Sequence, residues 1–259
     1  MPDGRVAALI ALAAIAIVGV GLLPPIAQDP AYHAFADRRA ALGIPNVANV
    51  VSNAGFAVVG ALGLGWLRRR GTALAAWERV AALILFAGVS LTAVGSAHYH
   101  LAPDNARLVW DRLPITLVFM PLFALVIGDR IDARAGRLLL LPLVAAGGAS
   151  VVGWHVSELA GRGDLRFYAL VQFFPMVAVP LILILFPARS LGAAWLWTAL
   201  VLYALAKAAE LADGWVLAAT GIVSGHTLKH IGAALSAACL LAMLAGRQPR
   251  EAPRLAAAR

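Results

Sequence analysis

The chain has 259 residues, of which 62% are hydrophobic and only 13% are charged, whereas soluble domains are about half apolar and about a quarter charged. This composition, with a mean hydropathy of +0.84, excludes a soluble enzyme, a disordered chain and a collagen. A single cysteine, Cys239, excludes an internal disulfide and a zinc cluster built from cysteines. The sequence therefore predicts an all-α, polytopic integral membrane protein.

Eight apolar runs are long enough to cross a bilayer, which takes about 20 helical residues. Backbone polar groups find no water in lipid, so each run is expected to be a helix. We expect spans at about 5–23, 47–67, 78–100, 111–128, 137–154, 168–186, 193–213 and 225–245. We interpret the first as a retained helix, because it is long for a signal peptide and Pro24-Pro25 is a poor match to a cleavage site. Residues 1–30 then form this helix and its connection, and residues 247–259 form a disordered basic tail.

The basic residues predict the orientation. The side that holds the N-terminus, called side B, carries 13 of the 21 lysines and arginines, and the opposite side A carries six, including Arg112. Positive residues concentrate in the cytoplasm, so both termini are expected there. Side A then faces outward, which in a bacterial inner membrane is the periplasm. The net charge of +8 is explained by topology, and no nucleic-acid partner is expected.

Polar residues at membrane depth are candidates for function, because they are expensive to bury in lipid. Ser96 and His100 lie four residues apart at the end of the third span, and Asp111 lies at the start of the fourth. His226 and His230 open the last span with the same spacing, which places both on one helix face. The topology brings all five to side A.

Three neutral imidazoles with an open fourth position are the ligand set of a catalytic zinc ion. Asp111 would take a proton from the zinc's water or orient a ligand, and Ser96 would bond that water or a developing oxyanion. A histidine pair can also be an inter-helix hydrogen-bonding pair, but the joint arrangement favours a metal site. His98 points away from this helix face, and we interpret His33 and His155 as solvated loop or boundary residues.

The pattern Ser-x3-His, Asp eleven residues later, and His-x3-His in the last helix resembles the alkaline ceramidases. More broadly, it resembles the CREST membrane hydrolase superfamily, which includes the adiponectin-type receptors. The resemblance implies a seven-helix ceramidase-like domain over residues 31–246, preceded here by one extra helix. It implies zinc bound by His100, His226 and His230, with Ser96 and Asp111 beside it. The implied activity is hydrolysis of the amide bond of ceramide-like membrane lipids to a fatty acid and a sphingoid-type amine.

A weaker correspondence lies upstream, where Asn49 to Asn53 resembles the Asn-x-x-Ser-Asn of these enzymes. The family carries a calcium-binding segment rich in carboxylates just before it, whereas this chain offers Asp37 and Asn46. Calcium needs six to eight oxygen ligands, so the alternative is that Asp37 pairs with an arginine and the asparagines join helices.

Two other classes of function stay open at this point. The first is a receptor or sensor on the same scaffold, and the second, ranked lower, is a metal or proton transporter. The spacing of Lys207 and Glu210 predicts an ion pair along one helix. Glu158 and Gln172 are candidates for a headgroup pocket, and neither the lipid's acyl length nor the oligomeric state is specified by the sequence.

Overall fold

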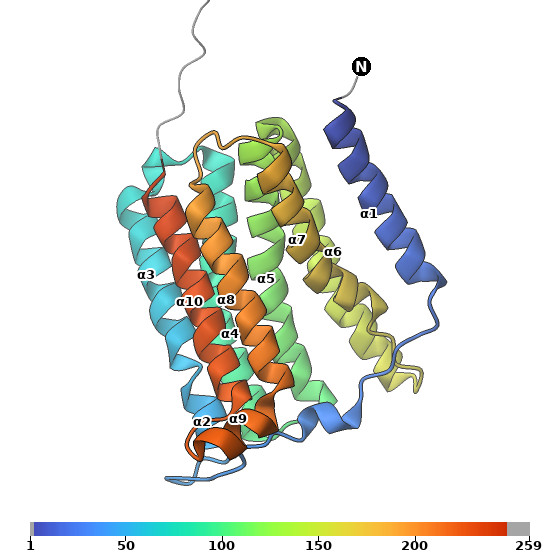
Figure 1. Ribbon diagram of the computed structural model, residues 1–259, viewed down its shortest axis with the longest axis vertical. Coiled ribbons are helices and arrows are strands. Elements are labelled where there is room, and N and C mark those ends of the chain that lie inside the picture. The colour runs from blue at the N-terminus through green and yellow to red at the C-terminus, as the bar shows by residue number, and fades with distance from the viewer. Residues whose placement is uncertain (1–2, 248–259) are drawn as a thin grey trace, which may run out of the picture.

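The computed structural model describes residues 3–247, which form an all-α bundle (Figure 1). Its helices in chain order are α1 (Gly4–Leu22), η1 (Pro30–His33), α2 (Val47–Val51), α3 (Ala54–Arg70), η2 (Gly71–Ala73), α4 (Ala76–Leu101), α5 (Asn105–Arg130), α6 (Ala133–Leu159), α7 (Arg166–Leu185), α8 (Ala193–Leu211), α9 (Asp213–Thr220) and α10 (Gly225–Ala245). Within the described residues, eight segments are long and apolar enough to span a membrane, with α2, α3 and η2 together forming the second. The eight predicted spans are confirmed, although α9 was not predicted.

The topology of the bundle places both ends of the described chain at the same end of the molecule. Figure 1 shows α1 beginning, and α10 ending, at the end opposite to η1, α2 and α9. An even number of spans requires this arrangement. The side A of the sequence analysis is therefore the end formed by η1, α2, α9 and the start of α10.

Helix α1 lies at the edge of the bundle, where it packs beside α7 (Figure 1). None of its residues is buried, so its apolar side chains are left to contact lipid. Arg5 joins it to the bundle, donating a 2.8 Å hydrogen bond to the carbonyl of Leu185 and stacking on the ring of Phe186. The segment that follows α1 returns across the side A end towards α2.

The predicted tail begins at Arg247, and residues 248–259 lie outside the described residues. Arg247 itself follows α10 and donates hydrogen bonds of 2.5 and 3.0 Å to the carboxylate of Glu78, at the start of α4. The first residue of the predicted tail is therefore fixed to the bundle by an ion pair.

A break between α2 and α3 has a local cause in the side chains of Ser52 and Asn53. The Ser52 hydroxyl donates to the carbonyl of Asn49 at 3.1 Å, and the Asn53 amide donates to the same carbonyl at 2.8 Å. Such side chains compete with the helical backbone for its carbonyl groups. The break turns Ser52 towards α10, where it contacts a predicted site residue.

Two glycines allow the helices that carry site residues to approach closely. A Cβ atom at Gly95 would lie 1.9 Å from the carbonyl oxygen of Trp110, between α4 and α5. A Cβ at Gly225 would lie 2.0 Å from the carbonyl oxygen of Ala209, where α10 begins against α8. Ser224 caps α10 by accepting a hydrogen bond from the backbone N–H of Thr227. The start of the last helix is therefore fixed one residue before His226.

Gly95→Ala is expected to destabilise the fold, because the added methyl group meets backbone atoms that cannot rotate away. Overpacking of this kind costs about 1–3 kcal/mol. Gly153→Ala is the matched control, since Gly153 lies in α6 with no atom within 4 Å of its Cβ position. The control is expected to be neutral or more stable by roughly 0.5–1 kcal/mol. Thermal unfolding of the purified variants in detergent checks both, and equal stability of the two would contradict the close approach.

Candidate metal centre

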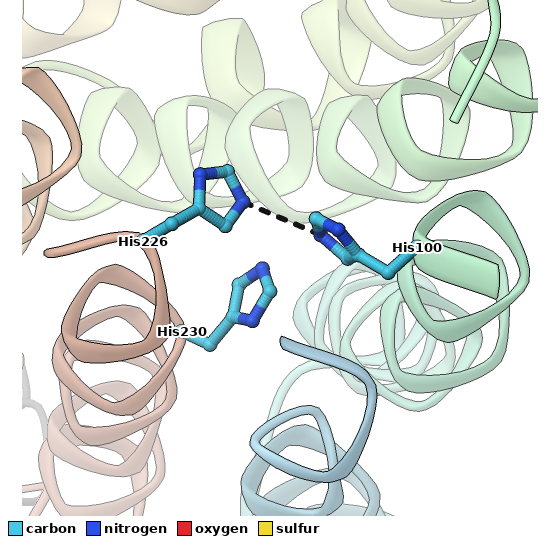
Figure 2. Close-up of side chains that lie close together, drawn as sticks. All are labelled: His100, His226 and His230. Atoms are coloured by element: carbon cyan, nitrogen blue, oxygen red, sulfur yellow. Dashed lines mark hydrogen bonds between the residues drawn. The ribbon is translucent and has the colours of Figure 1, made fainter. Parts of the chain in front are cut away.

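Three buried histidines from two helices converge at the side A end of the bundle. His100 lies in the last turn of α4, and His226 and His230 lie one turn apart at the start of α10 (Figure 2). Their exposed fractions are 0%, 3% and 2%. One ligand nitrogen from each lies within 4.8 Å of the other two, so this group can hold a metal ion. The predicted grouping of these three residues is confirmed.

The nitrogen positions provide a test of whether a small tetrahedral ion fits. Two nitrogens bound to one zinc ion at about 2.0–2.1 Å lie about 3.4 Å apart in tetrahedral geometry. The Nε2 atoms of His100 and His226 are 3.3 Å apart. The Nε2 of His230 is buried and has no hydrogen-bond partner, and Figure 2 shows it pointing between the other two rings. The donor set therefore fits a metal such as zinc, although it does not identify the metal.

The orientation of His230 is set by Ser52, which the break between α2 and α3 turns towards α10. The Ser52 hydroxyl lies 2.8 Å from Nδ1 of His230, so that Nε2 is the nitrogen left for a ligand. Polar groups that hold the second nitrogen of a metal-binding histidine fix its ring and its tautomer. Ser52 belongs to the Asn-x-x-Ser-Asn pattern, but the sequence predicted no role for it.

Ser52→Ala is expected to weaken zinc binding by about 10–100-fold, because the His230 ring loses its orienting partner. Ser90→Ala is the matched control, since among the described residues the Ser90 hydroxyl hydrogen-bonds only to the carbonyl of Phe86 within its own helix. Competition of the purified protein with a coloured chelator measures the affinity. Unchanged affinity in the Ser52 variant would show that the serine does not position the ligand.

The connection between α1 and α2 covers the histidines from the side A end. The ring of Phe35 lies 4.6 Å from that of His100 and 4.5 Å from that of His226, centre to centre. Asp213, at the start of α9, accepts hydrogen bonds from the backbone N–H groups of Ala36 and His226. Phe35 therefore excludes water from one side of the centre, and Asp213 ties this cover to α10. Neither residue was predicted to contribute to the site.

The remaining predicted catalytic residues lie beside a large cavity within the bundle. Ser96, Asp111 and His230 all line this cavity, which has a volume of about 430 Å³. The side chains of Ser96 and Asp111 are buried, and within the described residues neither makes a direct hydrogen bond or ion pair. Both are therefore available to a molecule in the cavity.

The cavity is polar at the level of the histidines and apolar beyond it. Val89, Leu122 and Leu240 line it on α4, α5 and α10 respectively. They lie 7, 11 and 10 residues towards side B from Ser96, Asp111 and His230 respectively, which is about 10–17 Å at 1.5 Å per residue. An acyl chain fits such a cavity, since its surroundings are aliphatic along most of its length.

An ion-pair network borders the histidines on the α8 side. The predicted pair of Lys207 and Glu210 is present, and Lys229 also contacts Glu210, at 2.8 Å. Nζ of Lys229 lies 3.4 Å from Nε2 of His226, and Tyr32 lies 3.3 Å from Glu210. Glu210 thus pairs with two partly buried lysines next to the centre, which leaves this trio with a net positive charge. The sequence predicted only the pair of Glu210 with Lys207. That Glu210 also lies near His226 is seen only in the tertiary structure.

The predicted calcium ligands make other contacts. Asp37 accepts hydrogen bonds from the Arg39 guanidinium at 2.6 and 2.8 Å, and these hold the pKa of its carboxyl below the ordinary value. The Asn46 amide donates to the carbonyl of His100 at 2.8 Å. Both residues thus hold the connection between α1 and α2, and α4, in place. The arginine pair of Asp37 agrees with the alternative to calcium binding. Calcium binding stays a prediction that these contacts do not favour.

The structure corrects one expectation for the other histidines. His98 is exposed and lies outside the metal group, as predicted. His33 is partly exposed, but its ring nitrogens are held by the protein, because they lie 2.8 Å from the Tyr99 hydroxyl and 2.9 Å from Asn105. His155 lies within α6 and is partly exposed.

The two other polar candidates fall on different parts of the molecule. Glu158 accepts hydrogen bonds from the backbone N–H of Gln28 and the indole N–H of Trp154, so it anchors the connection to α6. Gln172 lines the cavity and donates a 2.9 Å hydrogen bond to the Tyr203 hydroxyl.

No family model, curated protein or solved structure matches the chain. The indication of function therefore lies in the site itself, a buried group of three histidines beside a long apolar cavity with two free polar side chains.

Proposed function

We propose that the protein is a zinc-dependent intramembrane hydrolase that cleaves the amide bond of ceramide-like lipids. The observation that carries the proposal is a group of three buried histidines, one of which, His230, lines the polar end of a cavity suited to an acyl chain. The products are a fatty acid and a sphingoid-type amine. The membrane is both the location of the enzyme and the source of its substrate.

The chain's own residues divide the work of hydrolysis. His100, His226 and His230 would hold the zinc, which when bound supplies an activated water and polarises the carbonyl group. Asp111 accepts a proton from the attacking water and returns it to the leaving nitrogen as the C–N bond breaks. Ser96 donates a hydrogen bond to the oxygen on which negative charge develops. The apolar walls hold the acyl chain and exclude bulk water.

Metal content and lipid turnover of the purified full-length protein test this proposal together. We expect about one zinc per chain, fatty-acid release from some members of a panel of lipid amides and esters, loss of release after chelation, and recovery when zinc is added back. Bound metal without fatty-acid release from any lipid would favour the alternative function of a receptor or sensor. Absence of bound metal would exclude the proposed mechanism.

A further inference from the structure

Arg112 is a buried cation that the proposed mechanism does not use. It follows Asp111 on α5 and is only 6% exposed. The charge pattern predicted it to be one of the side A charges that set topology, and the structure corrects this. Its side chain lines the same cavity as Ser96, Asp111 and His230.

Aromatic rings and one neutral amide surround the guanidinium. Its Cζ atom lies 4.3 Å from the ring centre of Trp154, 4.7 Å from that of Tyr168 and 5.6 Å from that of Tyr32. Nη2 donates a 2.6 Å hydrogen bond to the side-chain oxygen of Gln28. Rings on its faces hold the planar group rigidly and leave its edge to form hydrogen bonds.

Arg112 has no ion-pair partner among the described residues. No carboxylate among them lies within ion-pair distance of it, and its Nη1 is buried with no hydrogen-bond partner. Lys207 and Lys229, the other cations that line the cavity, both pair with Glu210. Buried charges are normally paired, so Arg112 lacks the anion that its surroundings are built to accept.

We infer that Arg112 binds an anionic group of the lipid substrate, a carboxylate or a phosphate, at the polar end of the cavity. A guanidinium presents parallel N–H groups that match the oxygens of either anion. The inference rests on the proposed function for the position of the substrate. In that position the acyl chain lies in the apolar part of the cavity, the scissile amide lies near the histidines, and the acidic headgroup contacts Arg112. Among the ceramide-like lipids of the proposed function, the favoured substrates are therefore those with an acidic headgroup rather than neutral ones.

Equilibrium binding to the purified full-length protein in nanodiscs tests this without relying on turnover. The probes are N-palmitoylglycine, its methyl ester, which removes only the charge, and hexadecyl phosphate paired with neutral hexadecanol. We expect at least one acid to bind at least about tenfold more tightly than its neutral partner, as the loss of a charged hydrogen bond predicts. The acid that shows the difference identifies the headgroup.

Two variants assign the selectivity to the residue. Arg112→Gln is expected to abolish the difference between acid and neutral partner, whereas Arg162→Gln, which removes an exposed charge from the same end of the molecule, is expected to keep it. Equal binding of both acids and their neutral partners to the unmodified protein would overturn the inference, whether or not Arg112→Gln folds. Selective binding with no hydrolysis of any lipid would refute the proposed function alone, and hydrolysis without acid selectivity would refute this inference alone.

Discussion

Replacement of His226 with alanine is expected to remove both the bound metal and the hydrolytic activity. The variant leaves two imidazoles where a zinc ion needs three protein ligands to keep one position open for chemistry. Zinc content should fall from about one per chain to near zero, and fatty-acid release should fall to the background of the assay. Elemental analysis and lipid turnover on the same preparation measure the two effects together.

His98→Ala is the matched control for this experiment. His98 lies on α4 two residues before His100, but it is exposed and outside the metal group, so its removal should change neither quantity. Elution of both variants from gel filtration like the unmodified protein would show that the fold is kept. Full lipid hydrolysis by a folded His226→Ala protein would show that the mechanism is wrong.

Asp111→Asn is expected to lower kcat/KM by about 10²–10⁴-fold, the usual contribution of a positioned general base. The amide has nearly the shape of the carboxylate but cannot accept the proton. The metal should stay bound, because Asp111 is not among the three grouped ligands. The expected signature is thus full zinc occupancy with nearly complete loss of turnover, which distinguishes this variant from His226→Ala.

Asp104→Asn provides the same chemical change on the same helix. Asp104 caps α5 by accepting a hydrogen bond from the backbone N–H of Arg107 at 2.7 Å, and asparagine caps helices about as well. Its activity should stay close to that of the unmodified protein. Equal activity of the two variants would exclude Asp111 from proton transfer.

Much of the fold could be predicted from the sequence, because it depends on the hydropathy and length of each segment by itself. Helices are required by the lack of water in lipid, and their number follows from the lengths of the apolar runs. The depth that His100, His226 and His230 share at the side A end was predictable as well. It needs only the 3.6-residue period of each helix and the alternation of direction from span to span.

Contacts between distant segments could not be predicted in this way. The link between Ser52 and His230 depends on a helix break and on the register of α2 against α10. The cover over the histidines depends on where the connection after α1 returns to the bundle, which places Phe35 on two of the rings. No periodicity encodes such positions, because they result from the packing of segments far apart in sequence.

Arg112 shows most clearly what the sequence determined and what only the tertiary structure decided. The sequence placed it correctly at the side A end of the fourth span, where the charge pattern gave it the role of an ordinary loop arginine. Packing of α6, α7 and the connection after α1 then surrounds it with aromatic rings and turns its edge into the cavity. Hydropathy fixes how deep a residue lies along the membrane normal, but only the lateral packing of helices decides whether its charge meets solvent, a partner or a ligand.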